Sequence, residues 1–126
     1  MDKLEEIFQH QRTLQERLNI PGRITEPSMK QQYINQMALA LHEETVEMLC
    51  ATQYKDPEFV PFGWKRGQTF DPENFSEEVV DLMHFVVNLA LAAGMTSQQF
   101  YERYLDKNRE NHTRIDNGQR YEVKRL

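Results

Sequence analysis

The stretch VVDLMHFVVNLALAAGM, residues 79–95, decides the fold of this 126-residue chain. It is apolar on more than one face of a helix, and a helix of this kind must be buried on most of its sides. A predicted N-cap at Ser76, followed by Glu77 and Glu78, favours a helix start there, because the helix dipole stabilises anions in the first turn. Gly94 is typical of the residue that follows a helix end. We therefore expect one central helix over this stretch.

The segments around the central helix predict three further helices. Apolar residues at helical spacing predict helices over residues 3–19 and 28–54, and Thr96 or Ser97 is expected to cap a fourth. No segment alternates between apolar and polar residues for long enough to predict a strand. We therefore expect residues 1–126 to form a single all-α domain, a four-to-five-helix bundle.

The composition excludes several classes of function. The net charge of −5 argues against a protein that binds nucleic acid polymers, although metal ions could let an acidic chain bind a phosphorylated small molecule. No apolar run approaches ~18 residues, so no membrane span is expected, and the acidic, polar start argues against a signal peptide. The single cysteine, Cys50, favours a reducing, cytoplasmic setting.

The apolar character of the central helix also bears on the oligomeric state. Three other helices in a chain of this size do not suffice to surround it completely. A second copy of the chain would bury the remaining face, so we expect a homo-oligomer. A twofold homodimer is the default, and a dimer of dimers is the larger alternative.

Two pairs of acidic residues carry the first functional signal. In HEETVEML, residues 42–49, Glu44 and Glu47 are three apart, and Glu78 and Asp81 repeat this spacing. Residues three apart lie on one face of a helix, where like charges cost about 0.2–0.5 kcal/mol. A solvated face is the ordinary interpretation of one such pair, but Asp81 lies in an almost wholly apolar run. A buried carboxylate there must be protonated, paired or bound to a metal ion.

Four carboxylates on two antiparallel helices would form an oxygen-rich site for a hard cation. Such ligands suit Mg²⁺ or Mn²⁺ rather than Zn²⁺, which prefers nitrogen and sulfur. Four acids can also hold more than one ion, as phosphate-cleaving sites often do.

A phosphate site also needs cationic or amide donors, and KNRENHTR supplies them. Lys107, Asn111 and Arg114 follow one another at offsets of four and three, so they share one face near the end of the fourth helix. Arginine offers a bidentate fork to phosphate, and lysine a point charge. The alternative is a charged helix end that the helix dipole stabilises.

The ordered set of motifs resembles a known family. EETVE, EEVVDLMHF and KNRENHTR, followed by NG and Tyr121, resemble the all-α nucleoside triphosphate pyrophosphohydrolases, which include the dimeric dUTPases and the MazG-like enzymes. LQERLN, residues 14–19, resembles the dimeric dUTPase segment in which a Gln and an Asn meet the base. Trp64 and Lys65, in PFGWKRG, resemble the tryptophan-lysine loop of that group. The resemblance covers most of the chain, in the right order.

The resemblance implies a Mg²⁺-dependent hydrolase that cuts a nucleoside triphosphate to the monophosphate and pyrophosphate. Its implied site residues are metal ligands at Glu44, Glu47, Glu78 and Asp81, phosphate contacts at Lys107, Asn111 and Arg114, and a base pocket of Gln15, Asn19 and Trp64. Glu44 or Glu47 would orient or deprotonate the attacking water, and Trp64 would stack on the base.

The resemblance does not determine which nucleotide base the site prefers. We expect dUTP as the leading substrate, but the central loop is shorter than in many dimeric dUTPases. The chain is compact like MazG-like and phage forms, some of which prefer dGTP or another nucleotide. Glutamine and asparagine amides can read uracil, yet a flipped amide presents an equally good edge to guanine.

Two other classes of function compete with the hydrolase. One is a non-catalytic helical interaction module whose acids are merely solvated. The other is a di-iron carboxylate bundle, which expects repeated Glu-x-x-His pairs. The nearest candidate here is Asp81-x-x-His84, and it occurs once.

Overall fold

The computed structural model describes residues 1–20 and 26–118. Within them the chain forms four helices and no strand: α1 (Lys3–Arg17), α2 (Pro27–Cys50), α3 (Pro72–Ala92) and α4 (Ser97–Asp116). The predicted all-α fold is therefore confirmed. Tyr121, which contributed to the family resemblance, lies outside the described residues.

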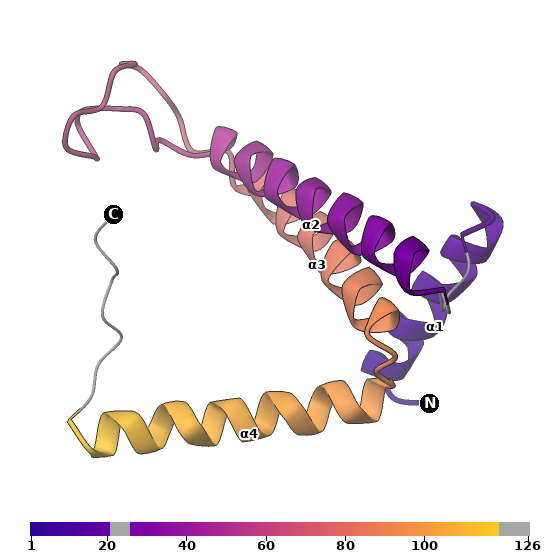
Figure 1. Ribbon diagram of the computed structural model, residues 1–126. Coiled ribbons are helices and arrows are strands. Elements are labelled where there is room, and N and C mark those ends of the chain that lie inside the picture. The colour runs from indigo at the N-terminus through magenta and orange to yellow at the C-terminus, as the bar shows by residue number, and fades with distance from the viewer. Residues whose placement is uncertain (21–25, 119–126) are drawn as a thin grey trace.

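The helices are arranged around one long antiparallel pair. α2 and α3 lie side by side and are joined by the loop of residues 51–71, whereas α1 packs against the C-terminal half of α3 (Figure 1). α4 turns away from α3 by 106° and points away from the α2–α3 pair. The expected bundle is therefore incomplete in a single chain, because its fourth helix does not pack on the central pair.

α3 begins one turn earlier than the sequence pattern indicates. The helix starts at Pro72, and the side chain of Asp71, not that of Ser76, caps it by accepting a hydrogen bond from the backbone N–H of Asn74 at 3.1 Å. Proline at the first helical position costs nothing, since its missing N–H would have no partner inside the helix. The hydroxyl of Ser76 donates to the carbonyl of Pro72 within the same helix.

The other helix ends follow the prediction to within one turn. Thr96 caps α4 in a reciprocal capping box with Gln99, as the sequence favours. α1 and α2 end at Arg17 and Cys50, earlier than expected. Gly94 adopts a φ of +79° between α3 and α4, a left-handed conformation in which glycine avoids the steric cost of a side chain.

The hydrophobic core is small and lies where α1 crosses α3. Phe8, Val87, Ala90 and Leu91 form its buried cluster, and the Phe8 and Phe100 rings pack with centroids 5.6 Å apart. The N-terminal half of α3 is different, because two of its apolar side chains remain exposed: Val79 at 43% and Val80 at 57%. The expectation that α3 is buried on most sides is therefore wrong for the first half of the helix in a single chain.

None of the helices within residues 1–20 and 26–118 is by itself long and apolar enough to cross a membrane. In that described part of the chain, α3 and α4 taken together, as a sharply bent pair, meet those criteria of length and composition.

Candidate active site

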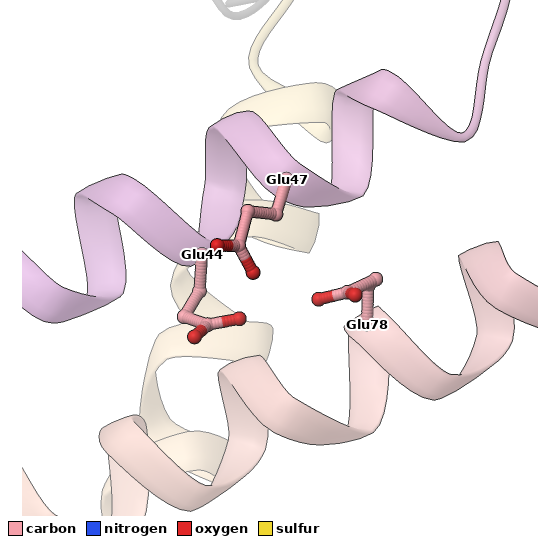
Figure 2. A group of neighbouring side chains, drawn as sticks. All are labelled: Glu44, Glu47 and Glu78. Carbon is pink, nitrogen blue, oxygen red and sulfur yellow. The ribbon is translucent and has the colours of Figure 1, made fainter.

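Three glutamates converge between the C-terminal part of α2 and the N-terminal part of α3 (Figure 2). Carboxylate oxygens of Glu44, Glu47 and Glu78 all lie within 4.8 Å of one another. We call these residues the glutamate triad. One oxygen of Glu44 and one of Glu78 are buried and have no hydrogen-bond partner. Burying such an oxygen without a partner is costly, so the triad has the charge and the free lone pairs that a cation would satisfy.

The electrostatics of the triad also favour a bound cation. Burial, followed by the neighbouring carboxylates of Glu47 and Glu78, raises the pKa of the Glu44 carboxyl to about 7. Each of these effects disfavours the charged form of the acid. A bound cation would oppose them, because it favours the charged form of every carboxylate around it. The all-oxygen ligand set fits a hard divalent cation.

Asp81, the fourth predicted ligand, lies beside the triad rather than in it. Its side chain is exposed, and no oxygen of Asp81 joins the cluster that the three glutamates form. The argument that Asp81 must be buried because it lies in an apolar run is therefore wrong for the single chain. It does line the same pocket as Glu44, one turn of α3 after Glu78.

A pocket of about 370 Å³ adjoins the triad, between α1, α2 and α3. Much of its wall is apolar, with leucine, isoleucine, methionine and phenylalanine side chains. Its polar lining residues are Gln11, Gln15, Glu44, Asp81, His84 and Asn88. A mostly apolar cavity with a few convergent polar groups is typical of a small-molecule site. Because Glu44 belongs to both the triad and the pocket, the two form one continuous site.

Side-chain amides from α1 and α3 form the floor of this pocket. Asn88 Oδ1 accepts hydrogen bonds from Gln11 Nε2 at 2.6 Å and from Gln15 Nε2 at 3.0 Å. The hydroxyl of Tyr33, from α2, donates to Gln15 Oε1 at 3.0 Å. All four side chains are buried. Gln15, predicted to meet a base, therefore lies in the pocket as a buried residue and is held by three helices.

The sequence pattern contains a signal for this floor that the prediction missed. Leu4, Phe8, Gln11 and Gln15 share one stripe of α1, so the two glutamines occupy positions that packing would fill with apolar residues. Asn88 is likewise a polar residue inside an apolar run. Buried polar side chains must find hydrogen-bond partners, which makes such positions candidates for a shared network.

The two other predicted base contacts do not line this pocket within one chain. Asn19 is exposed just after α1, in a left-handed conformation with a φ of +57°. Trp64 lies in the loop after α2 and is 72% exposed, with its ring edge-on to Tyr54 at a centroid distance of 6.2 Å. The structure thus brings Gln15 to the pocket but not its two predicted companions.

The loop that carries Trp64 is built on a buried acid that the sequence analysis did not single out. Asp56 accepts hydrogen bonds from the backbone N–H groups of Glu58 at 3.0 Å, Gly67 at 2.9 Å and Gln68 at 3.2 Å. These groups, chiefly that of Glu58, hold the pKa of the Asp56 carboxyl below its ordinary value although burial acts to raise it. A side chain at Gly63 would collide with the backbone next to Asp56. The loop is therefore an ordered structure.

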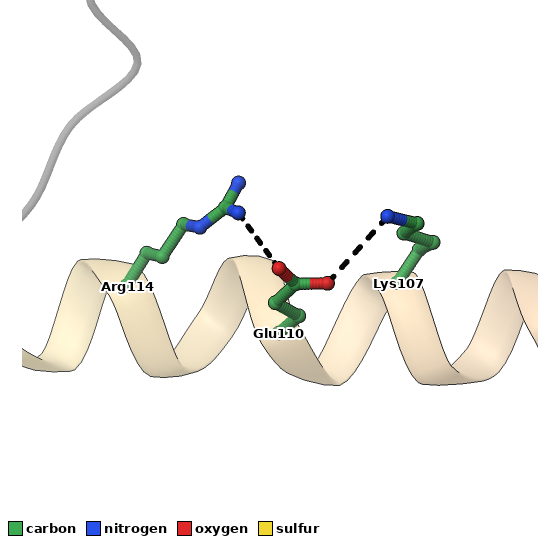
Figure 3. A network of polar contacts seen from close by, with 3 residues as sticks. All are labelled: Lys107, Glu110 and Arg114. Carbon is green, nitrogen blue, oxygen red and sulfur yellow. Dashed lines mark hydrogen bonds and ion pairs between the residues drawn. The ribbon is translucent and has the colours of Figure 1, made fainter.

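The predicted phosphate-binding residues lie on α4, away from the triad (Figure 1). Arg114 pairs with Glu110 at 2.7 Å, and Lys107 lies 3.7 Å from the same carboxylate (Figure 3). Asn111 is on the same helix, half-buried. A single chain therefore does not bring these three side chains to the triad, because α4 diverges from the pair of helices that holds it.

Comparison with known proteins gives the family. Residues 3–100 match the family model described as dUTPase. The chain belongs to the dUTPase family. This membership confirms the resemblance to the all-α nucleoside triphosphate pyrophosphohydrolases. In this dUTPase-family chain the matched span contains the triad, the pocket and the loop of Trp64, and it ends before Lys107.

One curated relative and the solved structures complete the comparison. The dCTP pyrophosphatase of Enterobacteria phage T4 is 39% identical to this chain over 57 residues, which make up 43% of the chain and 33% of the relative. The similarity thus spans about a third of that relative's length. No solved structure matches the chain significantly.

Proposed function

We propose that this protein is a divalent-metal-dependent nucleoside triphosphate pyrophosphohydrolase, with Mg²⁺ as the leading metal and Mn²⁺ as the alternative. Water would attack the triphosphate, and the products would be a nucleoside monophosphate and pyrophosphate. The observation that carries the proposal is the continuity of the site through Glu44. A cation-binding triad opens directly into a pocket whose size, apolar walls and amide floor suit a base. Membership in the dUTPase family supports the same reaction.

The triad would supply the metal ligands. Glu44, Glu47 and Glu78 would hold a cation between α2 and α3, and Asp81, at the pocket edge, would join them on the side that faces the substrate. A bound divalent cation would neutralise the negative charge on the phosphates. Glu47 is the exposed member of the triad, so its carboxylate reaches bulk water most easily. We assign Glu47 to orient the attacking water and accept its proton, with Glu44 as the alternative.

The pocket would take the base. Gln15 and the neighbouring amides can hydrogen-bond the base edge, and the apolar walls can cover its faces. We retain dUTP as the leading substrate, because the family is described as dUTPase. The name of the T4 relative adds dCTP as a second candidate, and dGTP remains a third.

A homodimer would complete the site. Val80 on α3 and Tyr104 and Ile115 on α4 are 57–63% exposed, although apolar side chains of this size are usually covered. A second copy packed against α3 and α4 could bury them. The α4 helix of that copy could then place its lysine, asparagine and arginine near the phosphates, which α4 of the same chain does not do.

The test is a panel of nucleotides. The purified protein is incubated with each deoxynucleoside triphosphate and Mg²⁺, and pyrophosphate is distinguished from orthophosphate in the products. We expect pyrophosphate with at least one nucleotide, and its loss on addition of a chelator. Release of no pyrophosphate from any nucleotide, with metal present, would refute the proposed function.

A further inference from the structure

The amide floor of the pocket is a directional network. Tyr33, Gln15, Gln11 and Asn88 come from α2, α1 and α3, and each is at most 9% exposed. In this environment a hydrogen bond cannot be exchanged freely for one to water, so each donor needs a defined acceptor. The orientation of one side chain therefore constrains the next.

The direction of the network begins at Tyr33. Its hydroxyl donates to Gln15 Oε1, so Gln15 must turn its Nε2 toward Asn88. Asn88 Oδ1 then accepts from Gln15 and from Gln11, which uses both lone pairs of that oxygen. What remains on Asn88 is its Nδ2 group, whose contact is the sulfur of Met37 at 3.5 Å, a weak acceptor. Met37 and Asn88 both line the pocket.

The opposite direction would leave a buried donor without a partner. If Gln15 were flipped, its Nε2 would donate to Tyr33, and the Tyr33 hydroxyl would have to find another acceptor. Within residues 1–20 and 26–118 the hydroxyl has a hydrogen bond to Gln15 alone. A buried, unsatisfied donor costs about 1–3 kcal/mol. Tyr33 thereby favours the direction in which Asn88 presents a donor to the pocket.

We propose that Tyr33 is a positioning residue for base selection. Through Gln15 it holds Asn88 with its Nδ2 donor available to the pocket. The site then prefers a base that carries a carbonyl oxygen over one that carries an exocyclic amino group at the same place. Uracil and cytosine differ in this respect at C4. The inference rests on the proposed function for its ligand class, since it assumes that the pocket takes a nucleotide base. A site built to donate to a carbonyl rejects an amino group, because two donors then face each other unpaired.

The experiment measures binding of dUMP and dCMP by calorimetry, without metal and without turnover. We expect the unmodified protein to bind dUMP about tenfold more tightly than dCMP, and Tyr33→Phe to reduce this ratio to about twofold or less, because the network then has no preferred direction. Tyr101→Phe is the matched control: it removes the same hydroxyl from an exposed position on α4 and should leave the ratio unchanged.

A second variant guards against misfolding of the first. Gln15→Met keeps the length of the side chain but cuts the link between Tyr33 and Asn88, and it should also abolish the base preference. Three results would each overturn the inference. They are an unchanged ratio of dUMP to dCMP affinity in either folded variant, a preference of the unmodified protein for dCMP, and no binding of either monophosphate. The nucleotide panel is a separate readout: a dUMP preference that depends on Tyr33, without pyrophosphate release, would refute the proposed function and leave this inference standing.

Discussion

Glu78→Gln should change the stability of the metal-free protein and its affinity for metal in opposite directions. The substitution keeps the shape of the side chain and, above the Glu44 pKa of about 7, removes one of three negative charges whose oxygens lie within 4.8 Å of one another. At 4.8 Å two unit charges repel by about 3.5 kcal/mol at an effective dielectric constant of 20 and by about 0.9 kcal/mol in bulk water. Because Glu47 is exposed and Glu44 is half-buried, we expect a net gain of about 1–3 kcal/mol in the free energy of unfolding without metal.

The assay is thermal unfolding, with a chelator and then with increasing Mg²⁺. For a chain of this size, a gain of that order raises Tm by at least about 4 °C. Mg²⁺ should raise Tm of the unmodified protein, since a ligand that binds only the folded state stabilises it. It should do so far less for Glu78→Gln, which lacks one of the proposed metal ligands. Loss of a group that only supports a ligand lowers metal affinity by about 10–100-fold, and loss of the ligand itself should lower it more.

Glu77→Gln provides the matched control for this prediction. It removes the same charge from the neighbouring residue of α3, which is exposed and outside the triad. We expect little change in Tm and an unchanged response to Mg²⁺. The reasoning is refuted if Glu78→Gln lowers Tm in chelator, or if its response to Mg²⁺ matches that of the unmodified protein.

Three further predictions concern pH, the loop and the active site. In chelator, Tm should fall as pH rises from about 4.5 to 7. The unfolded chain releases the Glu44 proton near its ordinary pKa of 4.5, whereas the folded state holds it up to about 7, so the stabilisation by this proton is lost as pH rises through that window. A Tm that rises over this window would contradict the raised pKa. Asp56→Asn should destabilise the loop, because an amide N–H₂ cannot accept the backbone hydrogen bonds that the carboxylate accepts. The change should be visible as faster proteolysis in the loop and altered Trp64 fluorescence, and an unchanged loop would show that these bonds do not hold it. Glu47→Gln should lower kcat by about 10²–10⁴-fold, as removal of a general base does. Mixing this variant with Arg114→Ala should restore part of the activity if α4 of one protomer acts in the site of the other. If the mixture is as inactive as the separate variants, each site is built within one chain.

The parts of the site that could be predicted are those whose geometry is local. Glu44 and Glu47 share a face of α2 because three residues are nearly one turn of any α-helix. The cap of α4 could be predicted for the same reason, since Thr96 and Gln99 are three residues apart. Such relations hold wherever the helix lies in the fold.

The selection of Glu78 over Asp81 for the triad could not be predicted in this way. Both residues share a face of α3, and the spacing alone treats them as equals. The angle and register at which α3 packs against α2 bring only one of them within 4.8 Å of Glu44 and Glu47. The early start of α3 at Pro72, with Asp71 as its N-cap, was also missed, because Ser76 has an equally good capping side chain.

The sequence by itself determined that this protein is all-α, that its helices present paired acids, and that its motifs follow the order of one superfamily. Only the tertiary structure decided which side chains meet. The amide floor joins residues 73 and 77 positions apart, and no local pattern specifies such a contact. The direction of α4 was likewise decided at the bend after α3, where a left-handed glycine turns the chain away from the triad. Periodicity describes one helix at a time, whereas a site made by three helices depends on how their surfaces pack.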